Sequence, residues 1–285
     1  MQLFTIFSNL TEFLDTEKQA GHKIAFIPTM GALHEGHISL IELGKKYADI
    51  TVCSIYVNPS QFNNDDDLKK YPRSFDSDAR LLEQVKCDVL FMPDDGEIYP
   101  PGLDTTIHLN LANLDQEMEG RFRPGHFKGM LQVVKRLLDI VHPDYLLMGQ
   151  KDYQQFSLVH HMIGQLQLPV QLIIGPTIRE ADGLAMSSRN QRLSIEDRKC
   201  ANAIYKYLLE LKSQLYTIAI EHLQNDFMTA LKNAGLKPEY LEIVDGFSLQ
   251  KVIHPDQHEC IVACVAAWVG DVRLIDNLIL KGNLL

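Results

Sequence analysis

Near its start the chain carries the stretch IAFIPTMGALHEGH, residues 24–37. Its apolar opening predicts a short buried strand, and the glycine-bearing turn that follows ends in His34 and His37. Residues 38–47 have apolar positions at helical spacing, so a helix should begin at the two histidines. The free backbone N–H groups and the dipole of a helix N-terminus favour phosphate, and Gly36 lets a ligand approach the backbone closely. The stretch therefore predicts a nucleotide phosphate site at the carboxyl end of a strand.

The tetrapeptide His-x-Gly-His is not decisive by itself. In a chain with 11 histidines and 17 glycines it occurs by chance in roughly a few per cent of cases. Two surface histidines on a helix cap are the competing interpretation. The strand before the turn and the helix after it favour the functional one.

Strand-like runs alternate with amphipathic helices up to about residue 176. We expect strands at 23–28, 50–57, 88–92, 144–148 and 170–174, and helices at 9–19, 36–48, 74–86, 127–142 and 152–166. This alternation predicts an α/β fold, with a Rossmann-like parallel sheet and helices on both of its faces. Such sheets bind ligands at the carboxyl ends of their strands. Residues 104–110 are a candidate for an additional strand.

The pattern changes around residues 175–190. Beyond it the sequence predicts two helices and then three strands, at 194–215, 218–234, 239–244, 259–268 and 271–276. Ser194 has the position of an N-cap, with acidic residues in the turn after it. We therefore expect a larger domain over residues 1–180 and a smaller C-terminal α+β domain, acting as a lid, over residues 181–285.

Composition narrows the class of protein. A net charge of −10 argues against nucleic acid as a partner. No apolar run reaches the ~18 residues of a membrane span, and the N-terminus has no export signal. An odd number of cysteines, five, then favours reduced thiols in a cytoplasmic protein. Cys260 and Cys264 have no second ligand pair at zinc-like spacing, so core thiols are the better interpretation.

Gln61 follows the second expected strand, in a turn that Asn58 and Pro59 force. Its amide offers two donors and an acceptor, which suit a neutral hydroxyl or a carboxylate. An ordinary turn glutamine is the competing interpretation. We expect Gln155, one turn into helix 152–166, to face the same cleft. The polar stretch 63–67 resembles either a mobile flap or a solvated acidic run.

An anionic nucleotide needs local positive charge, and the chain gathers it in three places. Arg121, Arg123, His126 and Lys128 lie within eight residues of one another. Lys151 follows the strand 144–148 and a glycine, where it can place a point charge on phosphate. Its neighbour Asp152 can cap the next helix or accept a ribose hydroxyl. Arg179 and Arg189 flank a loop, in which the segment Ser187-Ser188-Arg189 is interpreted as a mobile phosphate clamp or as a solvated linker.

Six motifs, in order along the chain from about residue 20 to its end, resemble those of the pantoate–β-alanine ligase (pantothenate synthetase) family, within the HxGH nucleotidyltransferase-like superfamily. They lie at 28–37, Asn58 to Phe62, Tyr71 to Arg73, Arg123 to Phe127, Gly149 to Gln155 and Met186 to Arg189. Two departures are small: Tyr56 and Gln150 stand where this family is expected to have Phe and Glu.

The resemblance implies ATP-dependent condensation of (R)-pantoate with β-alanine to pantothenate. The pantoate carboxylate attacks the α-phosphate of ATP, which releases pyrophosphate and leaves pantoyl adenylate. The β-alanine amine then displaces AMP. The resemblance also implies Mg²⁺ carried by the ATP phosphates, with no metal site of the protein's own, and a homodimer. The larger domain would bind both nucleotide and pantoate.

The resemblance also assigns residues. The catalytic ones are His37, His34 and Lys151, and Gln61 and Gln155 hold pantoate, with Gln61 also near β-alanine. The ATP site comprises Met30, Gly31, Ala32, Leu33, His34, Glu35, Gly36, His37, Gly149, Gln150, Lys151, Asp152, Ile178, Met186, Ser187, Ser188 and Arg189. The family is usually described with the second histidine as a proton donor. The sequence leaves open whether His37 donates a proton or acts as a fixed dipole.

Three other functions share parts of this pattern. Another His-x-Gly-His nucleotidyltransferase would release pyrophosphate without consuming β-alanine, but the neutral amides of Gln61 and Gln155 suit a small hydroxy acid better than a phosphate ester. An aminoacyl-tRNA synthetase is disfavoured by the acidic charge. A catalytically silent nucleotide-binding module is disfavoured by the presence of Lys151, both histidines and the Ser-Ser-Arg segment.

Overall fold

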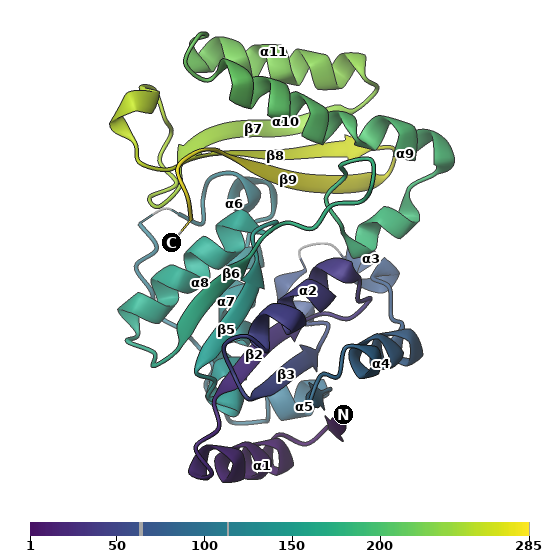
Figure 1. The fold of residues 1–285 in the computed structure, drawn as a ribbon, viewed down its shortest axis with the longest axis vertical. Helices are drawn as coiled ribbons and strands as arrows, with labels where there is room; N and C mark the ends of the chain where they lie inside the picture. The colour runs from purple at the N-terminus through teal and green to yellow at the C-terminus, as the bar shows by residue number, and fades with distance from the viewer. Residues whose placement is uncertain (63–64, 113, 285) are drawn as a thin grey trace. The chain divides into compact units, whose positions relative to one another are not determined.

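The computed structural model of the chain describes residues 1–62, 65–112 and 114–284 (Figure 1). The chain divides into two compact units. The first comprises residues 1–149 and 155–175, and the second comprises residues 150–154 and 176–285. The short segment 150–154 thus belongs to the second unit although its neighbours in sequence belong to the first. The expected domain boundary at residue 180 stays a prediction.

The first unit is built on a six-stranded sheet in the order β1-β4-β3-β2-β5-β6, with every pair of neighbours parallel. The strands are β1 (Gln2–Phe4), β2 (Ile24–Thr29), β3 (Ile50–Ile55), β4 (Val89–Phe91), β5 (Tyr145–Gly149) and β6 (Gln171–Gly175). The predicted parallel sheet is confirmed, whereas β1 was not predicted. Because the chain moves outward from β2 to β3 on one side and reaches β5 on the other, β2 is the switch point of the sheet, where α/β proteins bind ligands.

Helices cover both faces of this sheet. The longer ones are α1 (Phe7–Gln19), α2 (Glu35–Gly44), α4 (Phe75–Gln84), α7 (His126–Val141) and α8 (Tyr153–Gln165). The shorter ones are η1 (Pro59–Gln61), α3 (Asp65–Lys70), α5 (Asp95–Ile98) and α6 (Glu119–Phe122). On one face, Ile27 and Leu147 of the sheet form a buried apolar cluster with Ile41 of α2 and Leu82 of α4. This burial holds the start of α2 at the end of β2.

The candidate strand at 104–110 is wrong. Exposure alternates along these residues as it would in a strand, but they are not part of any strand. Instead, the N–H of Thr106 donates to the side chain of Asp104 at 2.9 Å, and that of Asn110 donates to Gln165 Oε1 at 3.2 Å. Side chains thus satisfy backbone groups that a sheet neighbour would otherwise bind.

The second unit is an antiparallel sheet of three strands, in the order β7-β8-β9, with helices packed on it. Its elements are η2 (Ser188–Arg192), α9 (Ile195–Ala201), α10 (Ala203–Gln214), α11 (Ile220–Asn233), β7 (Lys237–Asp245), η3 (Pro255–Gln257), β8 (Ile261–Val269) and β9 (Val272–Lys281). The smaller α+β unit is as predicted, except that the expected helix 194–215 is two helices separated at Asn202. Ser194 caps α9 as predicted, because its Oγ accepts the N–H of Asp197 at 3.1 Å.

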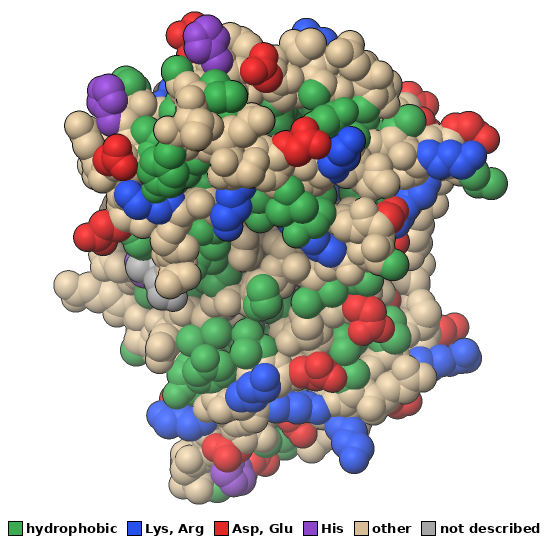
Figure 2. Space-filling view, turned by 45° about the horizontal axis from the view of Figure 1, so that its top comes forward, with side chains coloured by type: hydrophobic (Ala, Val, Ile, Leu, Met, Phe, Trp, Pro, Cys, Tyr) green, Lys and Arg blue, Asp and Glu red, His purple; other side chains and the backbone are tan. Residues whose placement is uncertain are grey.

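The core of the second unit lies between the sheet and helices α10 and α11. Alternate residues of β8, such as Ala263 and Val265, pack with Leu208 and Phe227 in one buried cluster. All five cysteines of the chain are free thiols. None of the helices in the described ranges is both long and apolar enough to span a membrane. On the face shown in Figure 2, acidic and basic side chains are interspersed rather than gathered by sign.

Candidate active site

The turn between β2 and α2 has an unusual backbone that a buried carboxylate holds in place. Gly31 and Ala32 both have positive φ, at 78° and 48°, which is easy for glycine and costs a residue with a Cβ about 1 kcal/mol. The N–H groups of Ala32 and Leu33 donate to the two carboxylate oxygens of Asp78, at 2.9 and 2.8 Å. Asp78 comes from α4 and is 2% exposed. This residue therefore fixes the path of the chain into the two histidines.

Substitution of Asp78 by asparagine should loosen this turn. The amide keeps one acceptor oxygen but places an NH₂ group against the second N–H, so one charge-assisted bond is lost. We expect local stability to fall by about 2 kcal/mol, measured as faster amide hydrogen exchange at residues 32 and 33. Asp76→Asn, on the exposed side of the same helix, is the matched control. Equal exchange in the two variants would show that the carboxylate does not hold the turn.

The two histidines cap α2 reciprocally. Nδ1 of His34 accepts the N–H of Gly36 at 3.1 Å, and Nδ1 of His37 accepts the N–H of His34 at 3.2 Å. The ring centroids lie 4.0 Å apart. A ring nitrogen that accepts a hydrogen bond carries no proton, so the proton of each neutral imidazole is on Nε2. In its neutral form each ring therefore has its N–H group at Nε2.

This arrangement changes one expectation from the sequence. The N–H groups of His34 and Gly36 are used by the histidine cap, and that of His37 donates to the carbonyl of His34 at 2.7 Å. The expectation that these N–H groups are free to hold phosphate is therefore wrong for these three. The dipole of α2 still favours an anion at this end.

Gln61 is buried, at 7% exposure, and both its side-chain amide and its main-chain carbonyl have polar contacts. Its side-chain Nε2 lies 2.8 Å from Sδ of Met30 in the β2–α2 turn, and its Oε1 accepts from Nδ2 of Asn58 at 3.3 Å. Its main-chain carbonyl accepts from Nδ1 of His126 at 2.8 Å. The structure thus brings Gln61 next to the turn that carries the histidines, as expected for residues at neighbouring strand ends.

The loop that carries Gln61 packs tightly on α7. A Cβ on Gly129 would lie 2.3 Å from the carbonyl oxygen of Ser60, so only glycine allows this approach. His126, at the start of the same helix, is 5% exposed. Of the expected cluster of positive groups at 121–128, His126 thus supports the Gln61 loop, and Arg123 lies 3.6 Å from the carboxylate of Glu119.

Tyr56, which stands where a phenylalanine is expected, has a structural role. Its hydroxyl donates to Asp95 at 2.7 Å. Burial, followed by this hydrogen bond, raises the pKa of the Tyr56 phenol. The extra oxygen is therefore kept as a neutral donor to Asp95 of α5.

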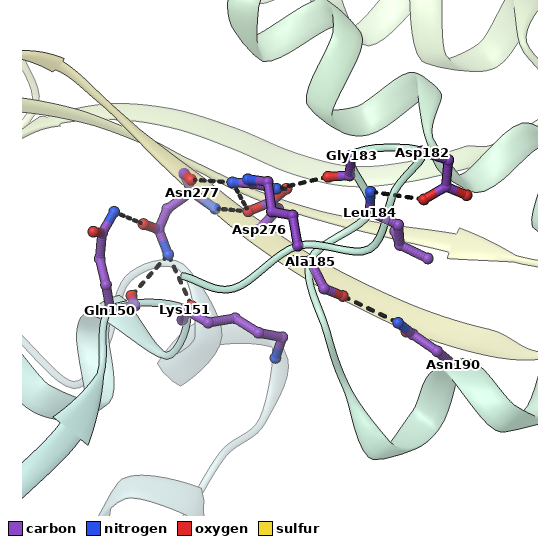
Figure 3. A network of polar contacts seen from close by, with 10 residues as sticks. Gln150, Lys151, Asp182, Gly183, Leu184, Ala185, Asn190, Asp276 and Asn277 are labelled. Atoms are coloured by element: carbon purple, nitrogen blue, oxygen red, sulfur yellow. Dashed lines mark hydrogen bonds and ion pairs between the residues drawn. The ribbon is translucent and has the colours of Figure 1, made fainter. Parts of the chain in front are cut away.

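In the second unit, the segment that carries Lys151 is bound to strand β9. Nδ2 of Asn277 donates to the main-chain oxygens of Gln150 and Lys151, at 3.0 and 2.8 Å (Figure 3). Nζ of Lys151 lies 3.7 Å from the carboxylate of Asp152, and the lysine side chain is 17% exposed. The side chain of Lys151 as a whole is thus mostly buried.

Next to Asn277, a buried ion pair joins β9 to the segment that precedes the Ser-Ser-Arg motif. Arg179 donates to both carboxylate oxygens of Asp276, at 2.7 and 2.9 Å, and to the carbonyl of Gly183 at 3.1 Å. Its guanidinium also stacks 3.7 Å over the ring of Tyr205. Burial raises the pKa of the Asp276 carboxyl, and the bonds from Arg179 oppose this rise.

The Ser-Ser-Arg motif follows a short hairpin-like segment in which Arg179 and Ala185 form an antiparallel bridge. Ser187 caps η2, because its Oγ accepts the N–H of Arg189 at 3.3 Å. Ser188 is buried, at 7% exposure, and lies at the start of this turn. The motif is therefore part of an ordered 3-10 turn that begins at Ser188.

The residues expected at the site fall into two groups, one in each unit. The first unit contains Met30, Gly31, Ala32, Leu33, His34, Glu35, Gly36, His37, Gln61, Gly149 and Gln155. The second contains Gln150, Lys151, Asp152, Ile178, Met186, Ser187, Ser188 and Arg189. That Gln61 and Gln155 face one cleft stays a prediction. Of the expected flap, residues 63 and 64 lie outside the described residues.

Reasoning from sequence missed three supporting residues: Asp78, His126 as a support of Gln61, and Asn277. Each acts across a long separation in sequence, which is 46 residues for Asp78 and Ala32. No local spacing connects them with the motifs. A polar residue at a position that should be buried, such as Asp78 in an amphipathic helix, is the only signal that could have found one of them.

Comparison with known proteins decides the family. The sequence model of the family described as pantoate–β-alanine ligase matches residues 2–279. The chain belongs to the pantoate–β-alanine ligase family. A similar protein, the pantothenate synthetase of Cytophaga hutchinsonii, is 42% identical over 281 residues, which are 97% of this chain and 98% of that relative. The resemblance read from the six motifs is thus confirmed.

Solved structures of pantoate–β-alanine ligases have the same fold. The pantothenate synthetase of Thermus thermophilus superimposes with a TM-score of 0.92 at 35% identity, over 99% of this chain and 100% of that one. The pantoate–β-alanine ligase of Francisella tularensis, in a complex with beta-gamma ATP and β-alanine, superimposes with a TM-score of 0.82 at 36% identity, over 99% of both chains. The predicted α/β fold with a smaller α+β unit is therefore that of the family.

Proposed function

We propose that this chain condenses (R)-pantoate with β-alanine to pantothenate, through pantoyl adenylate, with release of AMP and pyrophosphate. Membership of a family of pantoate–β-alanine ligases supports this. A similar protein from Francisella tularensis carries an ATP compound and β-alanine in its crystal structure. The chemistry is a carboxylate activation, because oxide is a poor leaving group and adenylation replaces it with AMP.

The observation in this chain that carries the proposal is the reciprocal histidine cap of α2. Adenylation moves negative charge onto the α-phosphate and the departing pyrophosphate, so it needs fixed donors in that region. The Nδ1 bonds orient both rings and place the proton of each neutral ring on Nε2. We infer that His34 and His37 direct these Nε2–H groups at phosphate oxygens, aided by the dipole of α2.

The other expected residues complete the proposed roles. Lys151 supplies a positive charge to the phosphates, and Ser187, Ser188 and Arg189 bind the triphosphate. Asp152 binds the ribose. The remaining residues that the family resemblance assigns to the ATP site line the nucleotide. Gln61, held by Asn58 and His126, and Gln155 bind pantoate through neutral amides. No covalent enzyme intermediate is required, because the adenylate itself is the activated species.

Mg²⁺ enters this proposal with ATP. Within residues 1–62, 65–112 and 114–284, no group of three or more His, Cys, Asp or Glu side chains is placed to hold a metal ion. Phosphate oxygens are the ligands that Mg²⁺ usually takes in such sites, so the ion is proposed to arrive as the MgATP complex. A homodimer remains an expectation from the family resemblance, and a cytoplasmic location remains the expectation from the odd number of cysteines.

The test is AMP formation with ATP, Mg²⁺, D-pantoate and β-alanine, omitting each component in turn. We expect AMP under multiple turnover only with all four, and pantothenate in an equal amount. Pyrophosphate without added β-alanine should stop at one equivalent of enzyme, as the adenylate accumulates. Multiple turnover without pantoate, or no AMP with all components, would contradict the proposal and favour another acceptor for the same nucleotide.

A further inference from the structure

Asn277 is buried, at 1% exposure, and every polar atom of its side chain is used. Nδ2 donates to the carbonyls of Gln150 and Lys151, at 3.0 and 2.8 Å, while Oδ1 accepts from Nε2 of Gln150 at 3.0 Å. Two adjacent peptide groups are therefore bound by one amide. Few side chains other than asparagine have both the two donors and the acceptor at this length.

Asn277 is itself held rigidly. Its N–H donates to the carboxylate of Asp276 at 2.7 Å, and its carbonyl accepts from Arg179 at 3.3 Å. These bonds form one continuous network from Arg179 through Asp276 and Asn277 to the backbone of Lys151, and Figure 3 shows its part around Asp276, Asn277 and Lys151. The amide that binds the 150–151 peptides thus stands on a strand that is braced by a buried ion pair.

A second tether acts at the other end of the same segment. The hydroxyl of Tyr153 donates to the carbonyl of Gly246 at 2.9 Å, and burial raises the pKa of this phenol, so it remains a neutral donor. A Cβ on Gly246 would lie 2.4 Å from Sγ of Cys260 and 3.0 Å from the Tyr153 hydroxyl. Glycine is therefore needed for this close approach. Asn277 thus binds Lys151 at its own carbonyl, and Tyr153 fixes the chain two residues further on.

We propose that Asn277 is a positioning residue for Lys151 in adenylate formation. In Figure 3 the lysine side chain runs away from Asn277, whose Nδ2 donates to the main-chain carbonyl of Lys151. Asn277 thus acts on the ammonium group through the backbone, by fixing where the flexible lysine side chain starts. The proposal rests on the phosphate-binding role given above to Lys151. A displacement of about 1 Å in such a group can cost 100-fold in rate.

The test compares three variants of Asn277 in single-turnover formation of pantoyl adenylate. Asn277→Asp keeps the shape but places a carboxylate oxygen against two carbonyls, Asn277→Ala removes the amide, and Asn277→Ser removes it while keeping a small polar group. We expect each to slow adenylate formation by about 10–100-fold, with the KM for pantoate changed by less than about threefold. Asn225→Asp, on the exposed side of α11, is the matched control and should keep the original rate.

A double-mutant cycle with Lys151→Ala separates positioning from general stability. If Asn277 acts through Lys151, then Asn277→Ala in the Lys151→Ala background should slow the reaction less than about twofold further. Equal fold-losses in the two backgrounds would overturn the proposal, as would a normal rate in all variants that fold. If Lys151→Ala alone reacts at the original rate, the role of Lys151 fails, and the proposal for Asn277 is overturned with it, although the ligase activity itself stands.

Discussion

Replacement of His37 by alanine should slow pantoyl-adenylate formation by about 10²–10³-fold and weaken ATP binding by less than about tenfold. The reason is that the Nε2–H of this ring is proposed to meet charge that develops only during transfer to the α-phosphate. The ring is oriented for this by the bond from the N–H of His34 to its Nδ1, at 3.2 Å. ATP in its ground state needs that donor much less. The measurement is single-turnover adenylate formation beside equilibrium binding of ATP.

Two further substitutions separate the donor from the cap. His37→Asn retains an acceptor at the position of Nδ1, so it should keep the cap of α2 and still lose most of the rate. His37→Gln places an amide N–H near the position of Nε2, so it should recover part of the rate without a titratable group. His160→Ala, exposed on α8, is the matched control.

The outcomes also decide how the ring acts. Similar losses of rate and of ATP affinity in His37→Ala would contradict a role confined to the transition state. A glutamine that recovers the rate would show that a fixed donor is sufficient. A glutamine as inactive as alanine, with ATP binding intact, would favour proton donation by the imidazole.

The elements that could be predicted are those with a strong local pattern. Strands β2, β3 and β5 are apolar runs followed by turn residues, and their parallel pairing follows from the helices between them. Strand β1 has only three residues, Gln2–Phe4, too few for a period, and it forms by pairing with β4, which is distant in sequence. Residues 104–110 show the opposite case, because they have a strand's alternation but side chains bind their backbone.

The candidate site could be predicted for a similar reason. Its motifs are continuous and follow strands or precede helices, so the fold class alone suggests where they lie. What could not be predicted is what holds them. The carboxylate of Asp78, the imidazole of His126 and the amide of Asn277 each bind main-chain groups of a distant segment. Such contacts depend on the three-dimensional path of the chain and leave no spacing in the sequence.

Removal of Arg179 should destabilise the second unit by about 3–5 kcal/mol. Asp276 is 4% exposed as a residue, and Arg179 gives its carboxylate two charge-assisted bonds of 2.7 and 2.9 Å. Arg179→Ala would leave this charge buried without its ion-pair partner. The only tryptophan of the sequence, Trp268, lies in β8 of the same unit. Urea unfolding followed by its fluorescence therefore measures the expected loss.

The pH dependence of this loss tests its cause. Burial already raises the pKa of Asp276, and Arg179 opposes the rise, so the pKa in Arg179→Ala should be higher still. A carboxyl whose pKa is higher in the folded than in the unfolded state favours folding at acid pH, and this contribution is lost as pH rises through the folded pKa. The deficit of the variant should therefore grow between about pH 4.5 and pH 7.5.

A matched control is Lys206→Ala, which removes an ion pair that spans 3.9 Å between side chains 67% and 54% exposed. Exposed pairs of this kind contribute little, so no measurable loss is expected. Arg179→Ala could instead be as stable as this control, or its loss of stability could be the same at both pH values. Either result would show that the ion pair between Arg179 and Asp276 does not stabilise this part of β9. In that case the rigid support inferred for Asn277 would have to come from the sheet alone.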